Sequence, residues 1–220
     1  MESAATRLAQ VEANIARMCK PARRETQDVT LIAVSKTHPA ERIAPLLEAG
    51  HRVFGENRVQ EAQDKWPQLR DRFGDAQLHL IGQLQSNKAE DAVALFDCIH
   101  SLDRASLLKA LAKAMDKAGK PVPCFVQVNI GDEAQKGGCP INQLPEFLDK
   151  VRAADIPLAG LMCMPPAGIE PAPFFAFLAK LARDNAVQGL SMGMSGDYET
   201  AVQLGATHVR VGTALFGARG

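Results

Sequence analysis

The stretch TLIAVSKTHPAERIAPLLEAG, residues 30–50, contains the repeating unit that decides the fold. A short apolar run over residues 30–36 predicts a buried strand that ends at Lys36. An amphipathic segment follows and stops at Gly50, and helices commonly end in glycine. A strand followed directly by a helix is the unit from which parallel sheets are built.

The same unit recurs along the rest of the chain. Strand-like runs occupy residues 30–36, 51–57, 78–84, 97–103, 124–130, 158–164, 189–194 and 208–217, and helix-like stretches separate most of them. Eight such units predict an α/β fold, a single (β/α)8 TIM-type barrel, with a doubly wound open sheet as the alternative. An apolar stripe predicts an extra N-terminal helix at about residues 3–19, and with no linker in sight we expect one domain, 1–220.

Composition narrows the class of protein. Lysine plus arginine and aspartate plus glutamate both number 25, and the chain has one Trp and one Tyr, so nucleic acid is not expected as a partner. The sequence shows no apolar stretch of membrane-spanning length and no secretory leader. The five cysteines lack CxxC spacing, which favours a reducing, cytoplasmic location. The histidines have no metal-ligand spacing, so we predict no metal site.

Lys36 stands at the carboxyl end of the first predicted strand, where (β/α)8 barrels carry their working groups. If Ile32 and Val34 point into the barrel, the two-residue period of a strand points Lys36 inward too. Partial desolvation there would lower the pKa of the lysine and favour attack of its amine on a carbonyl. The alternative is an ordinary lysine whose stem lies on the barrel while its ammonium reaches water.

Two glycine-containing loops follow the seventh and eighth predicted strands. In this fold these loops often bind phosphate through backbone N–H groups. Glycines let the backbone approach a ligand closely, and hydroxyls add donors. The residues concerned are Gly193, Ser195, Gly196, Gly212 and Thr213.

Arg210 alternates with Gly212 on the eighth strand and is expected to point inward. A buried arginine needs an anion or an acceptor, and a salt bridge to a neighbouring carboxylate is the alternative to a ligand. The first and eighth strands are neighbours in a closed barrel. An amine, a cation and a phosphate-binding loop side by side would suit pyridoxal 5'-phosphate (PLP). Its aldehyde would lie on Lys36, its ring near Arg210, and its phosphate at Ser195, Gly212 and Thr213.

The motifs AVSKTHP, FGENRVQE, HLIGQLQSNK, CFVQVNI, GLMCMPP and LSMGMSGDYETAVQLGATHVRVGTALFG resemble, in order and spacing, the pyridoxal phosphate homeostasis protein family. The resemblance implies a barrel related to the N-terminal domain of alanine racemase and a Schiff base between PLP and Lys36. It places the phosphate around Met194-Ser195 and Gly212-Thr213, Arg210 opposite the pyridine nitrogen, and Asn57 in the ring pocket. It also implies a protein that binds PLP, passes it on and buffers its free level.

The sequence leaves enzyme and carrier as alternatives. A PLP-dependent racemase needs a proton-transfer group on each face of the ring. Lys36 could serve one face, but the only tyrosine, Tyr198, falls in a predicted helix. We therefore expect little or no turnover and a monomer that contacts PLP-dependent apo-enzymes transiently. A racemase-like or Lys-dependent barrel enzyme, and a barrel that binds another phosphorylated metabolite without a covalent link, remain the competing hypotheses.

Three charged residues near the predicted strand ends complete the list of candidates. Glu61, after the second strand, is expected to be solvated at the start of a helix. Lys88, after the third strand, could cap the start of a helix or act as a second amine that receives the cofactor. Lys136, after the fifth strand, could contact a ligand or a recipient protein or could lie in a solvated turn.

Overall fold

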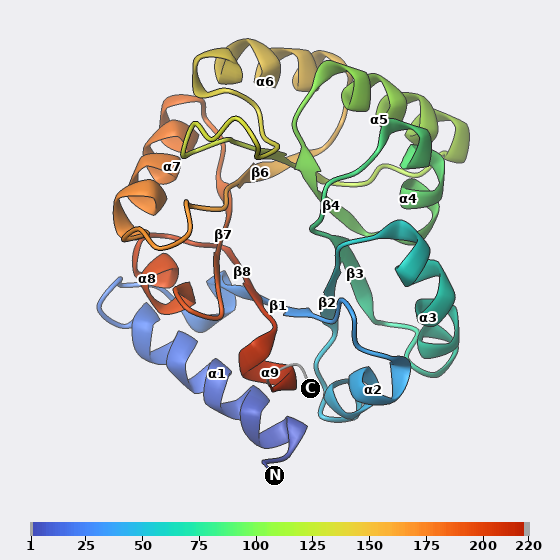
Figure 1. Ribbon diagram of the computed structural model, residues 1–220, viewed down its shortest axis with the longest axis vertical. Coiled ribbons are helices and arrows are strands. Elements are labelled where there is room, and N and C mark those ends of the chain that lie inside the picture. Colours follow the sequence, from blue (N-terminus) through green and yellow to red (C-terminus); the bar gives the residue numbers. More distant parts are fainter. Residues whose placement is uncertain (1, 218–220) are drawn as a thin grey trace.

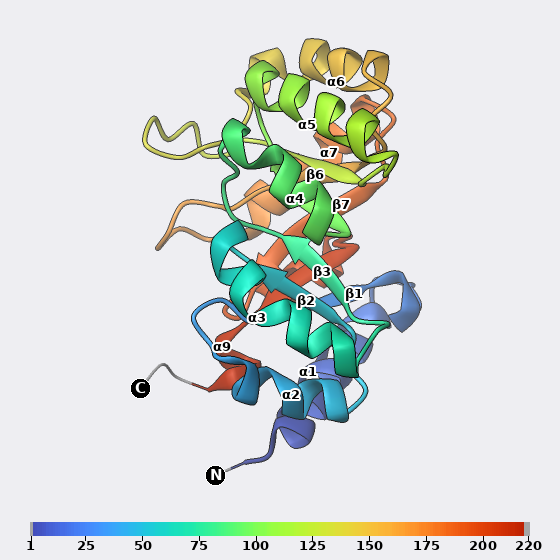
Figure 2. The same cartoon turned by 90° about the vertical axis from the view of Figure 1, so that its right-hand side faces the viewer.

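The structure is a computed structural model, and it describes residues 2–217. Met1 and residues 218–220, which belong to the predicted 1–220 domain, lie outside the described residues. Parallel strands form a closed barrel in sequence order, with helices around it (Figures 1 and 2). The strands are β1 (Thr30–Val34), β2 (Val53–Glu56), β3 (Gln77–Leu80), β4 (Cys98–Leu102), β5 (Cys124–Gln127), β6 (Leu158–Met162), β7 (Gly189–Met194) and β8 (His208–Val211).

The helices lie outside the barrel and alternate with the strands. They are α1 (Ala4–Cys19), α2 (Ala40–Glu48), α3 (Val59–Arg72), α4 (Ala89–Leu95), α5 (Ala105–Ala118), α6 (Leu144–Ala153), α7 (Ala172–Asp184), α8 (Tyr198–Gln203) and α9 (Thr213–Phe216). Short 3-10 turns occur at Thr26–Asp28, Ser86–Lys88 and Ile141–Gln143. The predicted (β/α)8 barrel is confirmed, and the open-sheet alternative is wrong because β8 pairs with β1.

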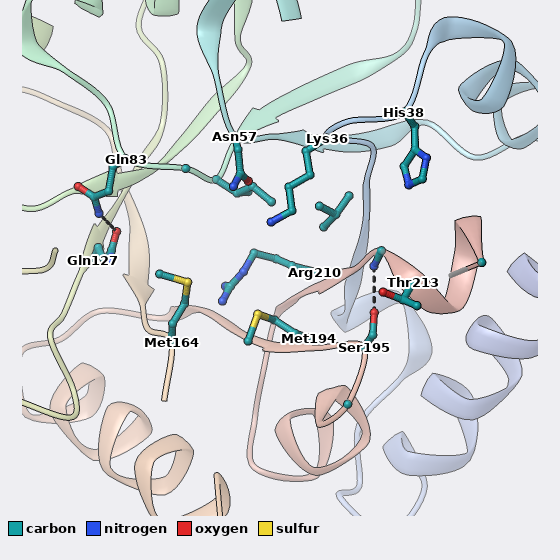
Figure 3. Close-up of a pocket in the computed structure, with 16 residues that line it drawn as sticks. Lys36, His38, Asn57, Gln83, Gln127, Met164, Met194, Ser195, Arg210 and Thr213 are labelled. Carbon is teal, nitrogen blue, oxygen red and sulfur yellow. Dashed lines mark hydrogen bonds between the residues drawn. The ribbon is translucent and has the colours of Figure 1, made fainter. Parts of the chain in front are cut away.

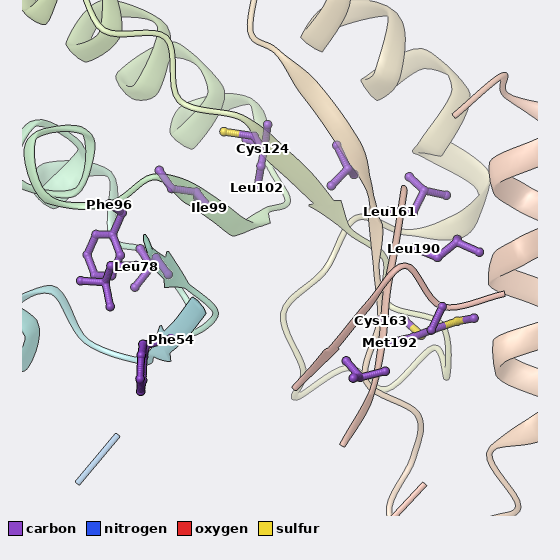
Figure 4. Packing of buried hydrophobic residues seen from close by; sticks show 14 of the residues in the cluster. Phe54, Leu78, Phe96, Ile99, Leu102, Cys124, Leu161, Cys163, Leu190 and Met192 are labelled. Carbon is purple, nitrogen blue, oxygen red and sulfur yellow. The ribbon is translucent and has the colours of Figure 1, made fainter. Parts of the chain in front are cut away.

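The main hydrophobic core lies between the strands and the helices. Most strands contribute alternate residues to it, as with Leu31 and Ala33 of β1, whereas Val34 lines a cavity inside the barrel mouth. Figure 4 shows part of this layer, including Phe54 of β2 and Leu78 of β3. Strands covered on both faces must be apolar on both, which explains the continuous apolar runs in the sequence.

The N-terminal helix α1 packs across the outside of α8 and α9 (Figure 1). Ser3 caps its first turn by accepting a hydrogen bond from the Thr6 amide. The Arg7 guanidinium of α1 donates to the Leu215 carbonyl oxygen of α9. Asn14 of α1 donates to the Tyr198 hydroxyl of α8 at 3.0 Å. The predicted extra helix is confirmed, and it supports the two elements that follow β7 and β8.

The strands are shorter than the apolar runs that predicted them. The run 208–217 yields β8 only as far as Val211, and Thr213–Phe216 form helix α9 instead of more strand. The residues beyond a barrel strand leave the ladder because no neighbouring strand continues beside them. All five cysteines are buried and free. Within residues 2–217, no helix is both long and apolar enough to cross a bilayer.

Candidate functional site

A cavity of about 440 Å³ opens at the carboxyl ends of the strands. All seven residues that the sequence predicted for a cofactor site contribute to its wall (Figure 3). They come from the ends of β1, β2, β7 and β8 and are Lys36, Asn57, Met194, Ser195, Arg210, Gly212 and Thr213. The barrel thus brings together residues from the two ends of the chain.

Lys36 is half-buried, and its side chain extends into the cavity toward Arg210 (Figure 3). It sits in a tight turn after β1, which the His38 amide closes by donating to the Ser35 carbonyl oxygen at 3.1 Å. Thr37, the third residue of this turn, has φ +64°, a region that glycine normally occupies in such turns. The geometry of this turn sets the direction of the amine.

Arg210 forms the floor of the cavity and is 4% exposed. Its guanidinium donates to the Ser191 hydroxyl at 2.6 Å and to the Cys163 carbonyl oxygen at 2.9 Å. Burial lowers the pKa of the Arg210 side chain from its usual value. Among residues 2–217 no carboxylate forms an ion pair with it, so the salt-bridge alternative raised by the sequence is wrong.

The loops after β7 and β8 meet beside Arg210. The Gly212 amide donates to the Ser195 hydroxyl at 3.1 Å, and Thr213 opens the adjacent α9 turn. The turn into α8 depends on Gly193, whose φ is +92° and where an added Cβ would lie 2.5 Å from the Ala201 Cβ. Hydroxyls and backbone amides therefore gather at this side of the cavity, as an anion would require.

Several residues of the opposite wall were missed by sequence reasoning. The Gln83 side-chain amide donates to the Gln127 oxygen at 2.6 Å, and Met164 lies on the same side of the cavity (Figure 3). Gly82 packs so closely on Asn57 that an added Cβ would lie 2.2 Å from the Asn57 carbonyl oxygen. The sequence did contain a signal for this wall: Gln127 is a polar residue at the carboxyl end of an otherwise apolar strand, where barrel sites lie.

Below Arg210 the barrel interior contains a chain of hydrogen-bonded polar groups. The Ser191 hydroxyl contacts His100 Nδ1 at 2.8 Å, and His100 Nε2 contacts His79 Nδ1 at 3.0 Å. Burial, together with the neighbouring His208, lowers the pKa of His79 to about 3. Burial and the Arg210 charge lower the pKa of His208 to about 4. These histidines are therefore neutral near neutral pH and act as hydrogen-bonding groups.

The structure also brings together a cluster that sequence spacing did not find. The ligand atoms of His79, Cys98 and His100 lie within 4.8 Å of one another, because they occupy the neighbouring strands β3 and β4. A metal ion there would have to break the hydrogen bond between the two histidines. It would also have to deprotonate Cys98, and burial raises the pKa of that thiol. The cluster is a hydrogen-bonded pair of histidines beside a neutral thiol.

Glu61 does not have the solvated position that the sequence predicted. Its carboxylate accepts hydrogen bonds from the Thr37 amide and from the Lys65 ammonium, the latter at 2.9 Å. Partial burial would raise the pKa of Glu61, but the hydrogen bonds from Lys65 and Thr37 outweigh it and hold that pKa below the usual value. The i,i+4 spacing of Glu61 and Lys65 on α3 was a local signal for one of these contacts. The contact with Thr37 was not, because it depends on how α3 docks against the turn after β1.

The remaining candidates lie outside this cavity. Lys88 pairs with Asp91 at 3.4 Å, and Lys136 pairs with Glu133 at 2.5 Å. Tyr198 is the first residue of α8 and is buried against α1, as the predicted helix implied.

Comparisons with known proteins agree with this architecture. Residues 6–220 match the family "Alanine racemase, N-terminal domain". The pyridoxal phosphate homeostasis protein of Pseudomonas aeruginosa is 39% identical, and the alignment covers 100% of this chain and 97% of that protein. The Escherichia coli protein of the same name is 38% identical over 100% of this chain and 98% of its own length.

A solved structure gives the same result. PipY of Synechococcus elongatus, determined with PLP bound, is 40% identical, with a TM-score of 0.80 over 92% of this chain and 100% of that chain. Sequence and structure thus match such proteins over nearly their whole length. The chain belongs to the pyridoxal phosphate homeostasis protein family, within the wider group that shares the alanine racemase N-terminal domain.

Proposed function

We propose that this protein binds PLP in the barrel cavity and takes part in PLP homeostasis inside the cell. One observation carries the proposal: the Lys36 amine and the Arg210 side chain face a single cavity beside the amides and hydroxyls of the β7 and β8 loops. The PLP-bound state of the 40% identical PipY supports it.

The residues present fit the chemical groups of PLP. An amine suits the aldehyde, the Ser195, Gly212 and Thr213 region suits the phosphate, and a planar cation suits the pyridine nitrogen. In the proposed attachment the Lys36 nitrogen bonds to the aldehyde carbon as a Schiff base, and the carbonyl oxygen leaves as water. Bound in this way, PLP would supply an electrophilic imine carbon that an incoming amine can attack.

The residues of the chain act mainly in binding. The hydrogen bonds from Arg210 to Ser191 and Cys163 fix its guanidinium, so this cation needs no reorientation when a ligand enters. Asn57 and Met194 complete the cavity wall on either side of Lys36 and Arg210. We propose Lys36, Asn57, Met194, Ser195, Arg210, Gly212 and Thr213 as the PLP-binding set.

A carrier is favoured over a racemase-like enzyme. A permanent cation beside the pyridine nitrogen disfavours its protonation and weakens the ring as an electron acceptor. Tyr198, the only tyrosine in the chain, lies in α8 and bonds to Asn14 of α1, outside the cavity. We propose a cytoplasmic monomer, a single PLP-binding domain over residues 1–220, that passes PLP to apo-enzymes through transient contact with little or no turnover.

Borohydride reduction followed by intact-mass measurement and peptide mapping tests the proposal. Protein mixed with PLP should gain one reduced adduct, on the peptide that contains Lys36. Lys36→Ala should abolish the adduct, whereas Lys117→Ala, which removes an exposed lysine paired with Glu90, should retain it. A full adduct in Lys36→Ala would contradict attachment at this residue, and tight PLP binding without any adduct would favour the non-covalent alternative.

A further inference from the structure

A buried lysine of α3 lies beneath the turn that carries Lys36. Lys65 is 9% exposed, and its ammonium lies 2.9 Å from Glu56 Oε1 and 2.9 Å from Glu61 Oε1. Glu56, at the end of β2, is fully buried and also accepts hydrogen bonds from the Ser35 hydroxyl and the Trp66 indole N–H. Neither Lys65 nor Glu56 lines the cavity.

The same ammonium binds the backbone on both sides of Lys36. Lys65 donates to the Ser35 carbonyl oxygen at 3.0 Å and to the His38 carbonyl oxygen at 3.1 Å. The Thr37 amide donates to Glu61, which Lys65 also binds. One peptide group before Lys36 is therefore held through its carbonyl, and the peptide group after it is held through its N–H.

The contacts among Lys65, Glu56 and Glu61 hold the backbone in one conformation more than they stabilise the fold. Burial raises the pKa of Glu56, even though Ser35, Lys65 and Trp66 all donate to it. Among the described residues, Glu56 Oε2 is buried with no hydrogen-bond partner. Buried charged groups of this kind often add little net stability, but they hold their neighbours in one conformation. Thr37 keeps its unfavourable φ of +64° in this setting.

We propose that Lys65, acting with Glu56 and Glu61, is a positioning residue that aims the Lys36 amine into the cavity. The inference rests on the proposed function, since it concerns the amine that would hold PLP. Its core is a statement about the chain itself: fixing both peptide groups around Lys36 fixes the direction in which its side chain leaves the backbone. Preorganisation of this kind raises affinity by reducing the ordering cost of binding.

Lys65→Met tests the role, because it keeps the length of the side chain and removes the charge. The affinity for PLP, measured per folded molecule by borohydride-trapped adduct, should fall by about tenfold or more. Lys120→Met is the matched control. Lys120 also caps backbone carbonyls, those of Val93 at 2.9 Å and Phe96 at 3.0 Å, but it does so away from the cavity. Its loss should lower stability and leave PLP affinity unchanged.

Hydrogen exchange of the Thr37 amide in the PLP-free protein provides a readout that does not depend on the ligand. In Lys65→Met this amide should exchange at least about tenfold faster than in Lys120→Met, since Glu61 loses the ammonium that holds it. Glu61→Gln keeps an oxygen acceptor for the Thr37 amide and should retain most of the PLP affinity. Glu61→Ala removes this acceptor and should lower the PLP affinity. This pair also provides the test if Lys65→Met does not fold.

The outcomes separate this inference from the proposed function. Wild-type protein that forms an adduct at Lys36, together with Lys65→Met and Glu61→Ala proteins of unchanged PLP affinity, would overturn the positioning role and leave the proposed function intact. Wild-type protein that forms no adduct would overturn both. Faster Thr37 exchange with unchanged affinity would mean that the contacts order the turn without aiming the amine.

Discussion

Single residues in the barrel interior determine how the cavity floor is held. Ser191 is the link between the cavity and the buried histidines, because its hydroxyl accepts from Arg210 and also contacts His100. Ser191 and His100 are both fully buried, so solvent cannot replace a lost partner. The position of the Arg210 guanidinium thus depends on a residue that does not itself line the cavity.

Ser191→Ala should destabilise the protein by about 1–3 kcal/mol, because one Arg210 N–H and His100 Nδ1 lose a buried partner. Urea unfolding of the PLP-free protein measures the change. Ser106→Ala, at an exposed position of α5, is the control and should change stability by no more than about 0.5 kcal/mol. Equal effects of the two substitutions would show that the Ser191 hydroxyl is not required to hold Arg210.

At the scale of elements, the passage from β7 into α8 is tightly constrained. Gly193 has a positive φ and lies directly against α8, so the turn leaves no room for a side chain. Helix α1 covers α8 and α9 from outside and bonds to both through Asn14 and Arg7. The loops that would bind phosphate are therefore fixed from within by packing and from outside by the N-terminal helix.

Gly193→Ala and Gly50→Ala form a matched pair that separates steric contact from backbone strain. Gly50 has a similar φ of +95°, but an added Cβ there meets nothing within 4 Å. Gly50→Ala should cost about 1 kcal/mol through strain alone. Gly193→Ala should cost a further 1–3 kcal/mol or so through overpacking against Ala201 and should also weaken PLP binding. Denaturant unfolding checks the first point, and equal losses for the two variants would contradict the close-packed turn.

Much of the element pattern could be predicted from the sequence, because barrel strands are buried on both faces and so appear as separate apolar runs. The two-residue period also placed Lys36 and Arg210 on the inner face correctly. The contacts of Lys65 with Ser35 and Glu56 could not be predicted, since these residues reach it only through the pairing of β1 with β2 and the docking of α3. The meeting of His79 with His100 likewise depends on how β3 pairs with β4. Strands buried on both faces lack the clear alternation from which this pairing could be inferred.

At the scale of the whole molecule, the barrel encloses a group of histidines that stay uncharged beneath the Arg210 guanidinium. His79 and His100 are buried, His208 is largely covered, and the nearest charged group is the Arg210 guanidinium. Burial first, and then the neighbouring histidines and Arg210, lower the pKa of His100 well below its usual value. Protonation of this interior is therefore linked to unfolding of the whole barrel.

Acid should destabilise the protein through these histidines. The unfolded chain takes up protons near its ordinary histidine pKa of 6.5, whereas folded His79 and His208 do so only at about 3 and 4. Between these values the unfolded state binds more protons, so the free energy of unfolding falls as pH falls. The slope should approach about 1.4 kcal/mol per pH unit for each histidine.

Urea unfolding at a series of pH values between about 6 and 4 measures this slope. His79→Gln should reduce the slope by the contribution of one histidine, because that group no longer takes up a proton on unfolding. An unchanged slope in that variant would show that His79 does not contribute to the acid sensitivity.

The pairing of β8 with β1 has a consequence for biosynthesis. Lys36 leaves the ribosome well before Arg210, Gly212 and Thr213 are made. A partly synthesised chain therefore exposes the amine without the floor and the anion-binding loops, and it has no compartment in which to retain an aldehyde. Capture of the vitamin-derived ligand can begin only after β8 has been made and has paired with β1.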